Sequence, residues 1–231
     1  MLREQSPYIK NSIKAIIIIL FYFFSYSYPT EILRFLGINL NGMDIIYKTT
    51  ILTIYEASIL FIVIYAYKDE LKQAVSKFKL SYIKDYIKYW ILILVLMVLS
   101  NNIVSMFTTT EVATNQEIII DTLKKAPIYI LITTILIAPL LEELIFRFCI
   151  KKIIPKPSII YILVSGLLFG SMHVVLTLEH ISDLLFIIPY SIPGIIFAYL
   201  YNKTDNILIP ASLHFIHNGV LMLLEVILQL V

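Results

Sequence analysis

Charged side chains are scarce in this 231-residue sequence: Asp, Glu, Lys and Arg make up 15% of it, against about 25% in a typical soluble domain. The hydrophobic content of 59% and the mean hydropathy of +0.88 exclude an ordinary soluble domain. The single cysteine, Cys149, excludes an intramolecular disulfide and a metal site built from several cysteines. The sequence also lacks a Gly-x-Ser-x-Gly elbow, a phosphate-binding glycine loop and a His-Glu-x-x-His motif. Serine hydrolase, nucleotide-binding and standard zinc protease signatures are therefore absent.

What the sequence has instead is a series of apolar segments of membrane-spanning length. They lie near residues 11–28, 49–67, 89–107, 127–149, 158–176, 184–201 and 207–230. We predict an all-α fold, a polytopic transmembrane helix bundle of about seven spans, with six to eight as the range.

The distribution of Lys and Arg predicts the orientation of this bundle. Most of the basic residues that flank the spans lie on the side of the N-terminus and of the lysine-rich segment 68–88. Cytoplasmic loops carry such an excess, so we expect a cytoplasmic N-terminus and a segment 68–88 at the inner leaflet. The Ile- and Lys-rich composition favours a bacterial cell membrane. We divide the chain into an N-terminal part (1–126) and a helix core (127–231).

Charged residues interrupt the fourth span, where Glu142, Glu143 and Arg147 lie within six positions. Such groups are costly in hydrocarbon and usually pair or line a wet cavity, so a functional site is the default interpretation. On a helix Glu143 and Arg147 share a face, whereas Glu142 points about 100° away from Glu143. We therefore expect Arg147 to neutralise Glu143 and to leave Glu142 free.

Histidines occupy two later spans. His173 follows Phe169 by four residues, and His214 precedes Asn218 by four, so that each pair shares a helical face. Gly166 is one of the small residues that allow a neighbouring helix close to His173, and we expect that neighbour to be the span with the glutamates.

Other polar residues receive simpler interpretations. His217 lies off the His214 face and is expected to pack, and Glu56 and Glu225 are expected to be paired or to face a cavity. Asp183, in a short loop, is expected to be solvated.

These side chains permit two mechanisms of amide hydrolysis. A buried carboxylate can serve as general base for water while imidazole and amide N–H groups stabilise an oxyanion. Alternatively, Glu142, His173 and His214 form an acceptable ligand set for a divalent metal such as Zn²⁺. The sequence leaves both mechanisms open. The partners we expect are a peptide or membrane-protein substrate and the lipid bilayer, with no nucleic acid.

The pattern resembles the three signature motifs of the CAAX protease and bacteriocin-processing (CPBP) family of intramembrane endopeptidases, which includes the CAAX prenyl proteases. The motifs here are Glu142-Glu143-x-x-x-Arg147, Phe169-x-x-x-His173 and His214-x-x-x-Asn218. The resemblance covers roughly 127–230. One position departs from the family, because Phe148 stands where a glycine commonly follows the arginine.

The resemblance implies a role for each motif residue. Glu142 would activate water, Glu143 and Arg147 would support it, His173 would hold the water or a metal, and His214 with Asn218 would stabilise the oxyanion. The family is often described as metalloproteases, although a metal-free glutamate mechanism has also been argued for it. The alternative function is a non-catalytic immunity or regulatory protein of the same fold. Counting helical rise from the expected helix ends, we predict that the cavity opens to the cytoplasm.

Overall fold

A computed structural model describes residues 2–108, 110, 112–154 and 158–230, and the side chains of 7–228 within those ranges. The first half of the chain forms α1 (Leu2–Ser27), α2 (Pro29–Phe35), α3 (Ile45–Ala66), α4 (Lys68–Lys77), α5 (Ser81–Ser105) and α6 (Thr114–Lys125). The second half forms α7 (Pro127–Ile132), π-helix η1 (Thr133–Ile137), α8 (Ala138–Glu142), π-helix η2 (Glu143–Cys149), α9 (Ile150–Ile153), α10 (Ile159–Val175), 3₁₀-helix η3 (Ile181–Phe186), α11 (Ile187–Thr204) and α12 (Leu208–Leu230). No strand occurs in these ranges, which confirms the all-α prediction.

Among the described residues, six helical stretches are long and apolar enough to cross a membrane. They are Pro7–Ser27, Ile45–Ala66, Ser81–Ser105, Pro127–Ile153, Ile181–Thr204 and Leu208–Leu228, and a shorter apolar helix covers Ile159–Val175. These seven helices correspond to the seven apolar segments of the sequence. The protein is therefore an integral, multi-pass membrane protein, as predicted.

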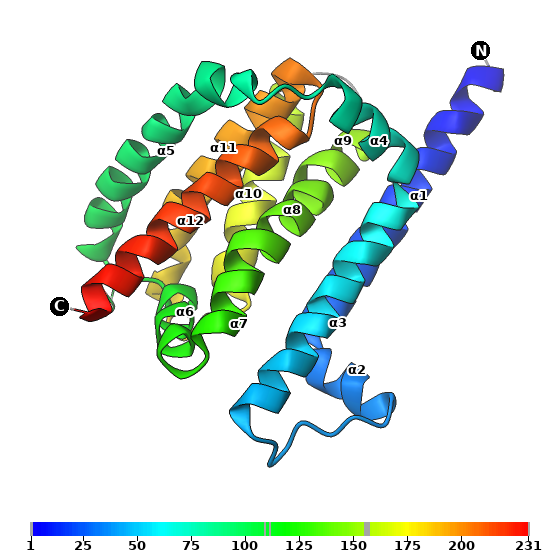
Figure 1. Ribbon diagram of the computed structural model, residues 1–231. Coiled ribbons are helices and arrows are strands. Elements are labelled where there is room, and N and C mark those ends of the chain that lie inside the picture. Colours follow the sequence, from blue (N-terminus) through cyan, green and yellow to red (C-terminus); the bar gives the residue numbers. More distant parts are fainter. Residues whose placement is uncertain (1, 109, 111, 155–157, 231) are drawn as a thin grey trace.

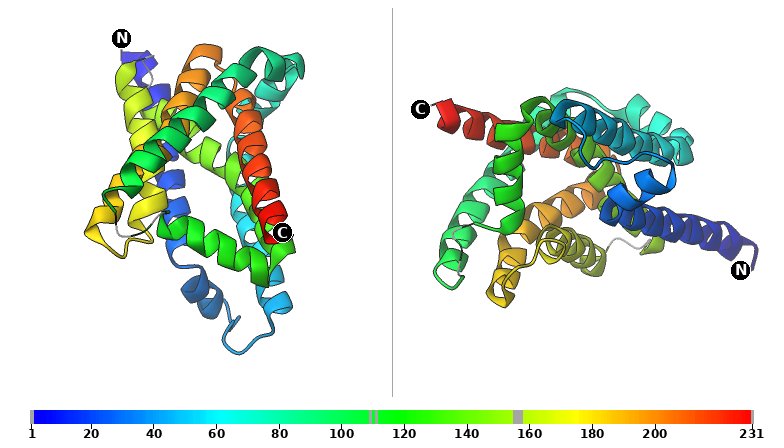
Figure 2. Two further views of the ribbon diagram at one scale, coloured as in Figure 1. Left: turned by 90° about the vertical axis from the view of Figure 1, so that its left-hand side faces the viewer. Right: turned by 90° about the horizontal axis from the view of Figure 1, so that it is seen from below.

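The helices form one bundle in which α7, η1, α8, η2 and α9 run end to end as a central rod (Figure 1). Helices α1 and α3 lie along one side of this rod, while α10, α11, α12 and α5 lie on the other side (Figure 1). The two further views in Figure 2 show α6 lying across the end of the bundle where α12 also ends. Residues of α1, α3, η2 and α10 share one buried core, so the predicted parts 1–126 and 127–231 pack together. The division at 126 stays a prediction.

Helices α10 and α11 approach each other closely because glycines line their contact. A Cβ atom at Gly166 would lie 2.7 Å from the backbone nitrogen of Ile195, and one at Gly194 would lie 2.7 Å from the carbonyl oxygen of Gly166. The sequence-based expectation about the partner of α10 was therefore wrong: the helix that the glycines admit is α11, not the span with the glutamates. Small residues permit such backbone contact whichever helix faces them, and their spacing does not identify the partner.

We expect Gly166→Val to weaken this contact, because the added side chain would meet backbone that cannot move without separating the two helices. Overpacking of this kind costs about 1 to 3 kcal/mol of unfolding free energy. The measurement is the thermal midpoint of the purified protein in detergent, followed by size-exclusion chromatography. Gly219→Ala is the matched control, since its Cβ would meet only Ile135, at 3.8 Å. Equal midpoints for the two variants would contradict this account of the α10–α11 contact.

Candidate active site

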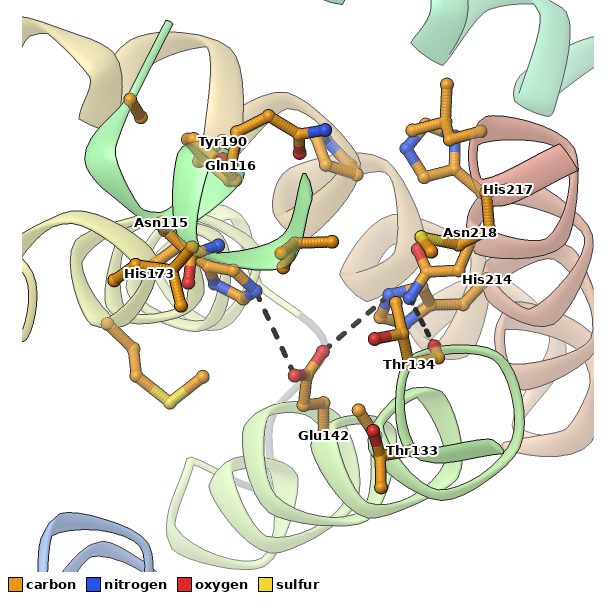
Figure 3. A pocket seen from close by; sticks show the side chains of 18 of the residues that line it. Asn115, Gln116, Thr133, Thr134, Glu142, His173, Tyr190, His214, His217 and Asn218 are labelled. Carbon is orange, nitrogen blue, oxygen red and sulfur yellow. Dashed lines mark hydrogen bonds and ion pairs between the residues drawn. The ribbon is translucent and has the colours of Figure 1, made fainter. Parts of the chain in front are cut away.

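The central rod is not a uniform α-helix, because π-helical segments precede and follow α8. In η1 the N–H of Ala138 donates to the carbonyl of Thr133, five residues earlier. Continuing that register, the carbonyl of Thr134 would need the N–H of residue 139, which is proline and has none. The side-chain Nδ2 of Asn218 on α12 donates to this carbonyl at 2.9 Å (Figure 3). Asn218 thus connects α12 to the rod just before Glu142.

The second π-helix, η2, is held in the same way by side chains of α10. The hydroxyl of Ser165 donates to the carbonyl of Phe146 at 2.6 Å, and the hydroxyl of Tyr161 donates to that of Arg147 at 3.3 Å. Both side chains are fully buried. π-Helical turns occur mostly at functional sites, and here they lie on both sides of the residue expected to be catalytic.

Glu142 lies between two histidines that come from different helices (Figure 3). Its Oε1 is 3.9 Å from Nε2 of His173, and its Oε2 is 3.6 Å from Nε2 of His214. Both distances are longer than a direct hydrogen bond. Each leaves room for a bridging water molecule about 2.8 Å from the carboxylate oxygen and from the ring nitrogen. Glu142 is buried, with 5% of its surface exposed. The structure thus brings together three residues that the sequence placed on three separate spans.

The other ring nitrogen of each histidine fixes its tautomer. Nδ1 of His173 lies 2.9 Å from the carbonyl oxygen of Phe169, and Nδ1 of His214 lies 3.0 Å from Oε1 of Glu143. A carbonyl and a carboxylate only accept hydrogen bonds, so Nδ1–H donates in both cases. In the neutral form, both Nε2 atoms therefore present a lone pair toward Glu142.

Glu143 and Arg147 form a fully buried ion pair beside this group. Nε of Arg147 lies 3.2 Å from Oε2 of Glu143, as the four-residue spacing predicted, and both side chains are 0% exposed. The guanidinium carbon lies 4.3 Å from the ring centre of Phe169 and 5.7 Å from that of Phe197. Arg147 is thereby enclosed by aromatic rings. Glu143 pairs with Arg147 and also accepts a hydrogen bond from Nδ1–H of His214, a second contact that the sequence did not indicate.

Aromatic side chains pack against both histidines, and the spacing of residues in the sequence did not predict these contacts. The ring of Tyr190 on α11 stacks on His173 at a centroid distance of 5.2 Å, and that of Phe197 lies 5.1 Å from His214. Phe148, which replaces the family's glycine, is buried and packs edge-on against Tyr67 at 4.9 Å. The substitution therefore changes packing on the side of the rod that faces α3 and α4.

A cavity of about 670 Å³ leads away from Glu142. Along the central rod its lining begins at Tyr129 and stops at Glu142, and along α12 it begins at His214 and runs to Glu225. Gln116 and other residues of α6 line it, whereas no residue of α4 does. The cavity thus extends from Glu142 toward the α6 side of the bundle.

This direction differs from the expectation of a cavity that opens to the cytoplasm, the side on which the sequence placed segment 68–88. The rise per residue of a straight helix predicts the depth of Glu142 in the membrane. It does not predict on which side of Glu142 the helices enclose a cavity. Only the three-dimensional arrangement of α5, α6 and α12 determines that side.

The remaining polar residues fall partly as expected. Glu56 accepts a hydrogen bond from the hydroxyl of Tyr129 at 2.8 Å, and Oε1 of Glu225 accepts one from Nε2 of Gln116 at 3.4 Å. Both glutamates line the cavity, and so does His217, which is buried.

The prediction for Asp183 was wrong, because Asp183 is 2% exposed. It accepts hydrogen bonds from the backbone N–H of His180 and the hydroxyl of Ser182, both at 3.3 Å. The short 3₁₀-helix η3 turns the carboxylate inward, a local geometry that the loop sequence did not reveal.

The suitability of the site for a metal can be judged from its donors. Two imidazole lone pairs face a carboxylate, and each imidazole is held through Nδ1–H, the arrangement typical of histidine ligands. The donor chemistry therefore matches zinc. In the described ranges, however, no three His, Cys, Asp or Glu side chains are grouped closely enough to hold an ion.

The fold and the site define a multi-pass membrane protein in which a buried glutamate and two histidines line an internal cavity. Comparison with known proteins agrees with this class: residues 124–220 match the family model described as Type II CAAX prenyl endopeptidase Rce1-like. This segment contains all three motifs, so the match agrees with the sequence resemblance to the CAAX protease and bacteriocin-processing family.

Two curated relatives support this assignment. The chain is 28% identical over 113 residues to "Putative membrane peptidase YdiL" of Bacillus subtilis, covering 48% of this chain and 43% of that protein. It is 30% identical over 158 residues to "Membrane-embedded CAAX protease MroQ" of Staphylococcus aureus, covering 62% of this chain and 60% of that protein. The chain thus spans about half the length of the curated relatives that it matches. No solved structure matches it.

Proposed function

We propose that this protein is an intramembrane endopeptidase that hydrolyses a peptide bond of a membrane-associated peptide or protein. The observation that carries the proposal is the position of the Glu142 carboxylate, which faces Nε2 of His173 and of His214 at the end of an internal cavity. The similarity of residues 124–220 to the Type II CAAX prenyl endopeptidase Rce1-like family supports the same conclusion.

Glu142 acts as the general base in this proposal. Water between Glu142 and His173 donates its hydrogens to the carboxylate oxygen and to the Nε2 lone pair, which leaves the water oxygen free to attack the substrate carbonyl. As the C–O bond forms, Glu142 takes the proton. When the C–N bond breaks, Glu142 returns that proton to the leaving amine.

His214 stabilises the oxyanion in its protonated form. With neutral histidines, the buried group of Glu142, Glu143 and Arg147 carries one net negative charge, and one added proton neutralises it. A proton on Nε2 of His214 provides an N–H donor directed into the cavity, while Glu143 at Nδ1 stabilises the imidazolium. Asn218 uses one amide hydrogen on Thr134, and its second one remains for the oxyanion.

The relatives are bacterial proteins, and we propose a bacterial cell membrane as the location, with the N-terminus in the cytoplasm. The cavity then opens toward the outer face, where a peptide such as a bacteriocin leader could be cut. Reporter fusions at the C-terminus that are active only outside the cell test this orientation, and a cytoplasmic C-terminus would reverse it.

Chelation separates the two mechanisms left open by the sequence. If Glu142 activates water without a metal, cleavage of a membrane peptide by the purified protein survives exhaustive chelation. Under the same mechanism His214→Ala lowers turnover by about 10²- to 10³-fold, the usual cost of one oxyanion donor. Activity is followed by mass spectrometry of the products, with zinc content measured on the same samples.

The control for this experiment is Lys125→Met, which changes an exposed residue on α6 and should leave turnover and zinc content unchanged. About one equivalent of zinc per protein that disappears, together with activity, in His173→Ala would show that the metal mechanism operates instead.

A further inference from the structure

The cavity wall carries charge of one sign. Three glutamates line it, namely Glu56, Glu142 and Glu225, whereas neither Lys nor Arg occurs among the described residues of the lining. Arg147 is close by but does not line the cavity, since it is fully buried behind Phe169 and paired with Glu143. A substrate group that enters this space therefore meets carboxylates without a compensating cation.

Glu56 is one of two lining carboxylates that the proposed chemistry leaves unused; the other, Glu225, accepts a hydrogen bond from Gln116. Glu56 lies on α3, which packs against η1 and α8, the segments that lead to Glu142. The hydroxyl of Tyr129 donates to its Oε1 at 2.8 Å and so orients the carboxylate. Among the described residues no second side chain or backbone group bonds to Glu56, although a carboxylate can accept several hydrogen bonds. Its other oxygen is available to a partner in the cavity.

Glu56 lies within the membrane span Ile45–Ala66, where an ionised carboxylate needs compensation for its charge. A glutamate at that depth is costly unless a cation or several donors compensate it, and one tyrosine hydroxyl supplies a single hydrogen bond. The missing compensation is supplied when a cationic group occupies the cavity. Clefts with charge of one sign and low-dielectric walls attract the opposite charge strongly and disfavour the same charge.

We infer that Glu56 recognises a lysine or arginine side chain of the substrate, close to the bond that is cut. By the same reasoning, the cavity disfavours a free C-terminal carboxylate, so that the preferred substrate is a cationic segment inside a chain and not its extreme C-terminus. This inference rests on the proposed endopeptidase function, and it names the substrate class of that site. Glu56 sets specificity by contacting a side chain of the substrate and does not touch the reacting atoms.

Peptide binding to a catalytically inactive protein tests the inference without requiring cleavage. The probes are apolar peptides of identical sequence, except that one central position is Lys, Gln or Glu. They are titrated into Glu142→Gln protein in phosphatidylcholine nanodiscs, with empty nanodiscs subtracted. We expect the Lys peptide to bind about tenfold more tightly than the Glu peptide, a ratio that one charge-assisted hydrogen bond supports.

Adding Glu56→Gln to this protein should bring the Lys-to-Glu ratio close to one, and adding Glu56→Lys should reverse it. Asp121→Asn is the matched control, because it removes one negative charge from an exposed position on α6 outside the cavity and should preserve the ratio. A ratio of affinities measured on one sample does not depend on the fraction of folded protein. A Lys preference that persists in Glu56→Gln, or no preference in the parent protein, would overturn the inference.

Cleavage assays with the active protein distinguish failure of the inference about Glu56 from failure of the proposed endopeptidase function. If the protein cuts peptides irrespective of their charge, the endopeptidase proposal stands and the role of Glu56 is wrong. If it binds the Lys peptide selectively through Glu56 but cuts none, the recognition site stands and the endopeptidase proposal is wrong.

Discussion

Glu142→Gln should abolish peptide-bond cleavage while the protein accumulates to normal levels. The substitution preserves the shape of the side chain and removes only its ability to take a proton from water, a step worth about 10²- to 10⁴-fold in rate. The ion pair of Glu143 and Arg147 does not involve Glu142, so the buried charges that stabilise the bundle remain paired. The measurement combines the rate of product formation in proteoliposomes with immunoblots of the membrane fraction.

Glu70→Gln is the matched control for this experiment. Glu70 lies on α4, outside the cavity, with 38% of its side chain exposed and its carboxylate 4.0 Å from the amine of Lys152. We expect wild-type turnover from this variant. Wild-type turnover from Glu142→Gln, in contrast, would contradict the peptidase proposal and leave the non-catalytic immunity or regulatory function as the better explanation.

The sequence was sufficient to predict the helical class of the protein and the ion pair of Glu143 and Arg147. Apolar segments of the right length can only be helices in a membrane, because every backbone group must be bonded within the segment. The four-residue spacing of Glu143 and Arg147 survives in the structure as an ion pair, even though η2 is a π-helix. The distance between two side chains on one helix depends mainly on their spacing in the sequence, so it can be predicted without knowing how the helices pack.

Features that depend on contacts between helices were missed. The hydrogen bond from Asn218 to the carbonyl of Thr134 depends on the π-helical hydrogen-bond register before Pro139. The sequence shows the proline but does not indicate the π-helical register. The stacking of Tyr190 on His173 depends on how close the glycines bring α11 to α10. The direction in which the cavity opens is likewise a property of the packed bundle.

The ion pair beside the active site should be as important for stability as Glu142 is for chemistry. Arg147 is 0% exposed, and Glu143 depends on it for charge compensation. Arg147→Met keeps similar side-chain volume between Phe169 and Phe197 but leaves a buried carboxylate with only the N–H of His214 as partner. Removing one member of a buried pair costs about 3 to 5 kcal/mol of unfolding free energy, so the variant should accumulate poorly and unfold at a lower temperature.

A double substitution separates the stranded charge from lost packing. Glu143→Gln combined with Arg147→Met removes both charges, so we expect most of the lost stability to return. Activity should not return with it, since His214 would then lack the carboxylate at Nδ1 that stabilises its protonated form. Thermal unfolding in detergent and cleavage rates, measured on the same preparations, report the two effects separately.

The matched control for the arginine is Lys151→Met, four residues further along the same rod. Lys151 pairs with Asp205 at 2.9 Å, but the side chain of Asp205 is 84% exposed, so water replaces the lost partner. Lys151 itself is 16% exposed, but a pair with one partner in solvent resembles a surface ion pair, which contributes at most about 1 kcal/mol. If Arg147→Met were as stable as Lys151→Met, the buried pair would not hold the rod in place, and the position of Glu142 would have to depend on Asn218, Ser165 and Tyr161 instead.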